Sequence, residues 1–271
     1  MIRTEHRDHG VLVVTIDRPE RRNALDPQTV AELHTVVQRA DGDPNVRAVV
    51  LTAVGASFCA GADLKSLPTD FTNTSATSTA ALLGATDSEV VRTLAAQELM
   101  ASLFERIHRM RQPVIAAING HAVGGGFALA LACDIRFSCP DAAFGAVFIR
   151  HGVSNCDMGT SYHLPRLVGA ARAAELMLTG RVFGAEEAQR IGLVFDVVPP
   201  EGLLDAAVAK AEEIAAHSPL AVWMTKETMW QTLDAPSLRH ALDLENRTQV
   251  MCTATGELRR SFDAFRDGSG R

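Results

Sequence analysis

The sequence predicts an α/β fold that ends in a region of helices alone. Short apolar segments alternate with amphipathic helical segments along the first 200 residues, and from about residue 201 only the helical pattern continues. A length of 271 residues suits one large domain, with or without a small appendage. We therefore expect a core over residues 1–200 and a C-terminal helical region over residues 201–271.

The first predicted unit is a strand, a helix and a second strand. Residues 10–16 have the composition of a strand, and a turn with a proline closes it. Asp26 and Pro27 supply an N-cap and a first helical residue, and apolar residues at helical spacing extend that helix to about Ala40. Residues 46–52 are nearly all apolar, which is typical of a strand buried on both faces. The two strands should therefore be parallel, with a right-handed crossover.

The next segment, residues 67–86, is rich in Thr, Ser, Ala and Asn and is predicted to be a loop. It is either a variable surface insertion or a lid over an active site. Beyond it the pattern predicts a helix, a strand, a glycine-rich turn, a short helix and a strand, over residues 88–110, 113–119, 120–126, 127–132 and 134–138. In the C-terminal region we expect helices from about Leu203, from Pro219 and over residues 238–252.

Composition and charge argue against several classes of protein. With 26 basic and 32 acidic residues the formal net charge is −6, which gives no general attraction for nucleic acid or for an anionic membrane. No apolar run approaches the ~20 residues that span a bilayer, and the polar N-terminus lacks a signal-peptide core. The five scattered cysteines form no CxxC pair, so we expect neither disulfides nor a metal site, and a cytoplasmic location.

Two stretches combine small residues with the end of a predicted strand. Residues 57–67 read SFCAGADLKSL, and residues 119–127 read NGHAVGGGF. Small residues let a ligand approach the backbone, and free N–H groups at a helix start favour negative charge. For each stretch alone, tight packing of a helix on a sheet is the favoured explanation. The second lacks the GK[ST] of a P-loop, and Leu129 breaks a GxGxxG pattern.

Taken together and in this order, the two stretches resemble the crotonase (enoyl-CoA hydratase/isomerase) superfamily. The resemblance rests on SFCAGADLKSL followed by PVIAAINGHAVGGGFALALACDIRF. Further matching stretches are IDRPERRNAL at residues 16–25, the segment over residues 164–198, and HSPLAVWMTKE at residues 217–227. The resemblance covers about residues 11–265, and only residues 67–86 have no counterpart in the family.

The resemblance implies a fold, a ligand and a site. The fold is a spiral of ββα turns, followed by C-terminal helices that build a homotrimer, often stacked as a hexamer. The ligand is an acyl-CoA thioester, and no cofactor is expected besides the coenzyme A of the substrate. The backbone N–H groups of Ala62 and Gly125 form an oxyanion hole. Two such donors stabilise the oxygen of an enolate-like state, and losing one typically costs ~3 kcal/mol of barrier.

Coenzyme A carries phosphates, so this acidic chain needs a local basic patch. The family resemblance places Arg21, Arg22, Ala60 and Lys65 along the coenzyme A channel. Each of the three cations could instead be a solvated surface residue, and for Arg21 and Arg22 this is the favoured interpretation. Whichever holds, phosphate binding must come from a few side chains and not from the charge of the whole protein.

The sequence departs from the family pattern at both carboxylates that a hydratase uses. Ala128 and Phe148 stand at these positions, and neither side chain can move a proton. We expect both to line the acyl pocket together with Tyr162. The ordinary mechanism of the family therefore does not transfer directly to this chain.

Asp157 is the first candidate for a replacement acid/base. The resemblance places it in the loop that lies over the reacting carbons in the family, and relatives that shift double bonds in dienoyl-CoA carry an Asp there. The alternative is that Asp157 only caps a helix that begins near Met158. Separately, Asn155 and Tyr162 are nearby candidates for orienting a ligand. Weaker acid/base candidates are His121, His151 and Glu98, and Cys59 and Cys156 are interpreted as packing residues.

Three functions are compatible with these features. The leading hypothesis is an enzyme that hydrates or isomerises a fatty or aromatic enoyl-CoA. The second is a non-catalytic protein that binds and delivers acyl-CoA, which the apolar Ala128 and Phe148 would suit. The third is a hydrolase of the same fold that does not use coenzyme A.

Overall fold

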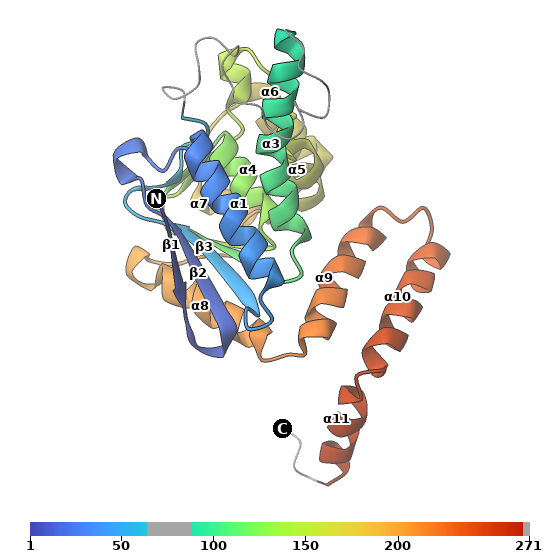
Figure 1. Ribbon diagram of the computed structural model, residues 1–271. Coiled ribbons are helices and arrows are strands. Elements are labelled where there is room, and N and C mark those ends of the chain that lie inside the picture. Colours follow the sequence, from blue (N-terminus) through green and yellow to red (C-terminus); the bar gives the residue numbers. More distant parts are fainter. Residues whose placement is uncertain (64–87, 268–271) are drawn as a thin grey trace.

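The computed structural model describes residues 1–63 and 88–267 and has an α/β architecture built on two sheets (Figure 1). The predicted loop at residues 67–86 and the side chain of Lys65 lie outside the described residues. Helices surround the sheets, and a set of C-terminal helices extends away from them. Over the described ranges, no helix is both long enough and apolar enough to cross a membrane.

The larger sheet has six strands in the order β1-β2-β3-β5-β7-β10. They span Ile2–His6, Val11–Ile16, Ala48–Ala53, Val114–Ile118, Ile135–Ser138 and Asp196–Val197. β1 is antiparallel to β2 and the remaining pairs are parallel. The predicted strand–helix–strand unit is confirmed as β2, α1 (Pro27–Gly42) and β3. The side chain of Asp26 caps α1 by accepting a hydrogen bond from Thr29 N at 2.7 Å.

The smaller sheet has four short strands in the order β4-β6-β8-β9. They span Ser57–Cys59, His121–Val123, Ala143–Gly145 and Phe183–Gly184. β6 falls inside residues 120–126, so the prediction of a simple turn there was wrong. Three residues between glycines carry no periodic signal, and they form a strand because β4 and β8 flank them on both sides.

The central helix of the core is α4 (Gly125–Ala132), all eight residues of which are buried. Around it lie α3 (Glu89–Arg109), α5 (Thr160–Val168), α6 (Ala170–Thr179) and α7 (Ala185–Arg190). The described residues also form three short 3₁₀ turns, η1 (Asp8–Gly10), η2 (Pro19–Arg21) and η4 (Phe148–His151). α4 begins two residues earlier than predicted, which places Gly125 at its first position.

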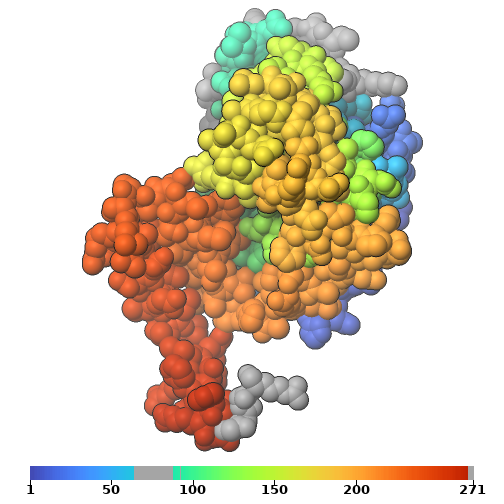
Figure 2. All heavy atoms as spheres, turned by 180° about the vertical axis from the view of Figure 1, so that it is seen from behind, coloured from blue at the N-terminus to red at the C-terminus, as the bar shows by residue number. Residues whose placement is uncertain are grey.

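The C-terminal helices divide into one that belongs to the core and three that project. α8 (Pro200–Ala215) lies across the larger sheet and buries Leu203, Ala207 and Ala211. The projecting part is α9 (Pro219–Leu233), α10 (Leu238–Thr253) and α11 (Glu257–Arg266), as both views show (Figures 1 and 2). The projecting part therefore begins after α8. Its exposed large apolar side chains include Leu238, Leu242, Val250, Met251, Leu258, Phe262 and Phe265.

Candidate active site

Two turns of the backbone meet at the ends of β4 and β6. Because these strands are parallel neighbours, the segments that follow them leave the sheet at the same edge. A Cβ placed on Gly61 would lie 3.0 Å from Gly125 N, and a Cβ placed on Gly125 would lie 3.7 Å from Ala62 N. The two turns thus touch through their main chains, which only residues without bulky side chains allow.

The amide of Ala62 is directed by a short backbone bridge to Leu25. Leu25 N donates to Gly61 O at 2.7 Å, and Asp63 N donates to Leu25 O at 3.0 Å. In a bridge of this parallel type, the N–H of the residue between those two partners points away from the other strand. Among the described residues the Ala62 N–H has no hydrogen-bond acceptor. It is therefore available to a ligand.

The amide of Gly125 is available for a different reason. Gly125 is the first residue of α4, where backbone N–H groups have no acceptor inside the helix. The preceding Gly124 has φ +55° and supplies no side-chain cap. The dipole of α4 adds a partial positive charge at this end. Both amides thus come from turns in contact, as an oxyanion hole requires.

Asp157 lies in the loop between η4 and α5, half-buried. Its Oδ1 accepts a hydrogen bond from Gln97 Nε2 on α3. Burial raises the pKa of this carboxyl, and hydrogen bonds from Met158 N and Gln97 offset part of that effect. The next residue, Met158, has its sulfur 3.4 Å from the position of a Cβ on Gly125. The loop that carries Asp157 therefore lies against the two turns.

The interpretation of Asp157 as a helix cap is wrong. α5 begins at Thr160, its N-cap is Gly159, and no side chain caps it. Asn155 does not orient a ligand either, because its amide is used inside the protein: Oδ1 accepts from Ile149 N at 3.0 Å and Nδ2 donates to Met177 O. Asn155 is 4% exposed and fastens this loop to η4 and α6.

The three residues expected in the acyl pocket lie in different places. Ala128 is fully buried in α4 as part of the core. The ring of Phe148 reaches the turns, with Cε1 3.7 Å from the position of a Cβ on Gly124. Tyr162 is half-buried, donates to Asp234 Oδ2 at 3.0 Å, and lies under the guanidinium of Arg166.

Tyr162 lines a cavity of about 1290 Å³ between α3, α5 and α9. Met158 and Gly159 also line it, so the cavity reaches the loop that carries Asp157, whereas Ala128 and Phe148 are not among its lining residues. Glu98, a weaker candidate, is exposed along this cavity, and His121 and His151 are exposed elsewhere on the surface.

Three of the four residues expected to contact coenzyme A, Arg21, Arg22 and Ala60, lie close together in the structure. Arg21 and Arg22 are exposed, and within residues 1–63 and 88–267 neither has an ion-pair partner. Ala60 N donates to Arg22 O at 3.1 Å, so Ala60 adjoins this basic pair. Lys65 lies outside the described residues.

The described cysteines and potential metal ligands give no indication of thiol or metal chemistry at this site. Burial raises the pKa of the Cys59 thiol to about 12, so this thiol stays protonated, as a packing residue does. Cys156 is exposed and free. In the part of the chain that the structure describes, no three His, Cys, Asp or Glu side chains gather as metal ligands would.

Two parts of the site were not identified from the sequence. Gln97 is an exposed polar residue of α3, and the apolar periodicity that predicts this helix gives no information about it. The ion pair of Arg18 with Asp63 was also missed, although the two matching stretches IDRPERRNAL and AGAD carry opposite charges. Complementary charges in two separate motifs are the one local signal that points to such a contact.

This fold, with two free amides from adjoining turns, defines a class of protein. The family profile described as "Enoyl-CoA hydratase/isomerase" matches residues 6–268, and the chain belongs to that family. Its fold is the crotonase fold, with two mixed sheets and C-terminal helices.

Individual relatives cover nearly the whole chain. A protein of Mycobacterium bovis named "Probable enoyl-CoA hydratase echA12" is 39% identical over 252 residues, which are 92% of this chain and 84% of that protein. The (E)-benzylidenesuccinyl-CoA hydratase of Thauera aromatica is 36% identical over 263 residues, 94% of this chain and 92% of that one. The crystal structure of a probable enoyl-CoA hydratase/isomerase from Mycobacterium abscessus aligns with a TM-score of 0.86 at 36% identity, covering 99% of this chain and 96% of that chain.

Proposed function

We propose that this protein hydrates an enoyl-CoA or shifts its double bond, with the thioester oxygen held by the N–H groups of Ala62 and Gly125. The observation that carries the proposal is that both amides lack acceptors among the described residues and belong to turns in contact. Either reaction passes through an enolate-like state, in which negative charge collects on that oxygen. Two fixed donors stabilise this charge more than they stabilise the neutral thioester, which lowers the barrier.

In this proposal Asp157 is the general acid/base. A carboxyl that is half-buried, has a raised pKa and is held in place by a neighbouring amide suits proton transfer at a carbon next to the thioester. In an isomerisation Asp157 would take a proton from one carbon and return it to another. Hydration additionally needs a positioned water molecule, and the apolar Ala128 and Phe148 offer no group to hold one.

The proposal also assigns the remainder of the ligand and the assembly. Arg21 and Arg22 would bind phosphates of coenzyme A beside Ala60, and Lys65 would contribute from the adjoining segment. The acyl group would lie near Phe148 and extend toward Tyr162. The exposed apolar residues of α9, α10 and α11 support assembly into a homotrimer or a dimer of trimers. Cytoplasmic location stays a prediction.

A second candidate is a protein that binds acyl-CoA without reaction. It is favoured by the apolar side chains Ala128 and Phe148 at the two positions where the family resemblance expects carboxylates. It predicts tight binding of acyl-CoA by calorimetry and no turnover of any enoyl-CoA. A structure with coenzyme A bound would exclude the third hypothesis, a hydrolase that does not use coenzyme A.

The test compares the wild-type protein with Asp157→Asn on 2-enoyl-, 3-enoyl- and dienoyl-CoA. The panel includes an aryl-substituted enoyl-CoA, because the relative from Thauera aromatica is named for such a substrate. We expect Asp157→Asn to lose at least ~100-fold in turnover, which is within the usual contribution of a general acid/base, and to bind acyl-CoA as before. Equal turnover by both proteins would remove Asp157 from the mechanism. No turnover by the wild type would favour the binding protein.

A further inference from the structure

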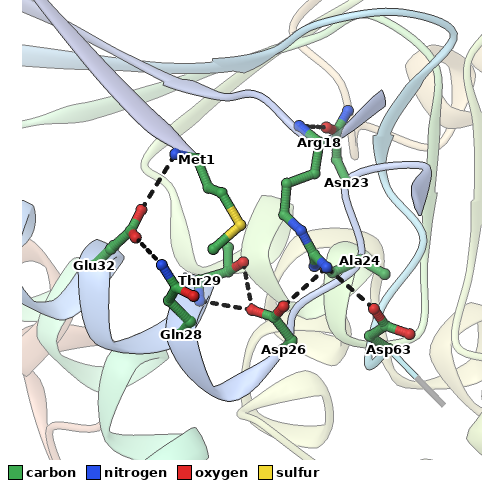
Figure 3. A network of polar contacts seen from close by, with 9 residues as sticks. All are labelled: Met1, Arg18, Asn23, Ala24, Asp26, Gln28, Thr29, Glu32 and Asp63. Carbon is green, nitrogen blue, oxygen red and sulfur yellow. Dashed lines mark hydrogen bonds and ion pairs between the residues drawn. The ribbon is translucent and has the colours of Figure 1, made fainter. Parts of the chain in front are cut away.

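Arg18 is a buried arginine beside the turn that carries Ala62. It is 7% exposed and its guanidinium contacts two carboxylates, Asp26 Oδ2 at 2.8 Å and Asp63 Oδ2 at 3.2 Å (Figure 3). It also donates to the carbonyl oxygen of Ala24. Because three acceptors surround one planar group, the guanidinium is held in a single orientation.

The partners of Arg18 flank the backbone bridge that directs the Ala62 amide. Ala24 and Asp26 lie on either side of Leu25, and Asp63 directly follows Ala62. Leu25 and Ala62 are themselves the two bridged residues. The guanidinium of Arg18 therefore contacts both of the segments that the bridge joins. Any shift of Asp63 relative to Leu25 would turn the Ala62 N–H relative to Gly125.

Charge gives this contact its strength. Asp63 is 7% exposed and lies near the carboxylate of Asp26, so the two negative charges repel each other unless a cation stands between them. Asp26 also caps α1 through its other oxygen, Oδ1, which accepts from Thr29 N at 2.7 Å. Although burial raises the pKa of Asp26, the hydrogen bonds from Thr29 and the charge of Arg18 leave it lowered. The Asp26 carboxylate is thus held in place by α1, and the guanidinium of Arg18 links the Asp63 carboxylate to it through two ion pairs.

The backbone behind Arg18 is fixed as well. Asn23 is fully buried, and its Oδ1 accepts from Arg18 N at 2.8 Å (Figure 3). Its Nδ2 donates to Val54 O at 2.8 Å and to Ser57 O at 2.6 Å, which ties the segment to the strand leading into the turn. The backbone of Arg18 is therefore held, through Asn23, to the start of β4, the strand that precedes the turn carrying Ala62.

We infer that Arg18 is a positioning residue for the oxyanion hole: by clamping Asp63 to Asp26 and Ala24, it sets the direction of the Ala62 N–H without touching the substrate. This inference rests on the proposed function. It predicts that loss of Arg18 affects turnover and ligand binding differently. Loss of Arg18 should weaken the stabilisation of the thioester oxygen and lower kcat, whereas binding through the phosphates of coenzyme A should be retained.

The experiment measures the hydrogen bonds to the thioester oxygen directly. The probe is hexanoyl-CoA, which has no double bond to react, isotopically labelled at its carbonyl and observed by infrared difference spectroscopy. Donors at the oxygen lower the C=O stretching frequency, so the wild type should shift the bound band below that of free hexanoyl-CoA. Arg18→Met should lose much of this shift, and Arg18→Lys, which keeps the charge but not the planar fork, should lose less.

Turnover should follow the spectrum. We expect kcat to fall about 10- to 100-fold in Arg18→Met, since a donor displaced by a fraction of an ångström to an ångström carries a cost of that order. KM should change less than threefold. Asp63→Asn keeps the shape and the Arg18–Asp26 pair, so it decides the question if Arg18→Met does not fold, and it should lose part of the band shift.

The matched control is Arg136→Lys. Arg136 is 6% exposed, as deeply buried as Arg18, but the hydrogen bonds of its guanidinium go to backbone carbonyls, including Leu193 O at 2.7 Å. It should lose stability and keep the band shift and kcat. A wild-type band shift and kcat in folded Arg18→Lys and Asp63→Asn would overturn the inference and leave the proposed function intact. Absence of both the shift and turnover in the wild type would instead reject the proposed function.

Discussion

The side-chain amide of Gln97 donates a hydrogen bond to Oδ1 of Asp157 and so joins α3 to the loop before α5. The two residues are 60 positions apart in the sequence. The bond restrains the carboxylate in one orientation and favours its charged form, whereas burial favours the neutral form. Burial thus opposes two hydrogen bonds, from Met158 N and from Gln97, and the one from Gln97 can be removed by a single substitution.

Gln97→Leu should move the acidic limb of the pH dependence of kcat/KM to higher pH. Removing the donor leaves burial to raise the pKa of Asp157 further, so a larger fraction of this base is protonated at any acidic pH. Activity should fall several-fold at the acidic end and approach the wild-type value at alkaline pH. The measurement is a pH series of kcat/KM, with Gln38→Leu, an exposed glutamine on α1, as control. A limb that stays in place would show that Gln97 does not influence the group whose protonation limits the rate.

Gly125→Pro should remove one donor of the proposed oxyanion hole while keeping the helix. Proline is favoured at the first position of a helix, where its missing N–H serves no helical bond, and Gly125 holds that position in α4. We expect kcat to fall by about 10²- to 10³-fold. Thermal unfolding checks that the protein is folded, and calorimetry checks that it still binds acyl-CoA.

Gly125→Ala is the comparison for that variant, because it keeps the N–H. Its Cβ would lie 3.4 Å from the sulfur of Met158 and 3.5 Å from Gly61 Cα, which are ordinary contacts. It should lose much less turnover than Gly125→Pro. Equal losses in both variants would mean that space at Gly125, and not its hydrogen bond, limits the reaction.

The elements that local signals specify were predictable from the sequence. The Asp26–Pro27 pair marks the start of α1, and the apolar run at residues 46–52 marks β3, because a cap and a buried strand are written in neighbouring residues. The second sheet was not predictable in this way. β4 and β6 have three residues each and pair across 64 positions of sequence, so only the folded chain gives them their strand geometry.

The candidate site was predictable only through the resemblance to a family. Ala62 and Gly125 would act through their main chains, which leave no side-chain pattern beyond small size. Asp157 could be proposed from its loop, yet whether it capped a helix depended on where α5 begins, and helix ends are the least certain feature of a sequence pattern. The Arg18–Asp63 pair spans 45 positions and needs the fold to form.

Because His163 is buried, the free energy of unfolding should decrease as the pH falls below the ordinary pKa of histidine. This residue is 4% exposed, and burial lowers its pKa from 6.5 to about 3. Between these two values the unfolded chain binds a proton at His163 that the folded protein does not, so its contribution to stability is complete above pH 6.5 and is lost as the pH falls. One such proton gives a slope of at most about 1.4 kcal/mol per pH unit.

His163→Phe should therefore flatten the loss of stability on acidification. The new ring can still pack against His108 and Trp230, whose ring centroids lie 4.7 and 5.7 Å from that of His163. Urea unfolding at several pH values from about 4 to about 7 measures the slope, because an ordinary histidine changes its protonation within this range. His240→Phe, at an exposed position of α10, should leave the slope as it is. An equally steep loss in His163→Phe would assign the acid sensitivity to other groups.

The ion pair and hydrogen bond of Lys226 should be the main interactions that hold the projecting helices to the core. Lys226 lies on α9, is 7% exposed, and its Nζ donates to Asp134 Oδ2 at 2.7 Å and to Gln112 O at 3.1 Å. Lys226→Met would leave the carboxylate of Asp134 buried without its cation, which should lower the free energy of unfolding by about 3–5 kcal/mol.

The double variant Lys226→Met/Asp134→Asn separates charge from packing. An asparagine oxygen can still accept the bond that Val114 N gives to Asp134 at 2.8 Å, so removing both charges should restore much of the lost stability. Urea unfolding measures all variants, and Arg239→Met, which breaks the exposed pair with Asp243 on α10, should cost at most about 0.5 kcal/mol. If Lys226→Met costs no more than Arg239→Met, the buried pair is not what holds α9, and packing of its apolar residues must do so.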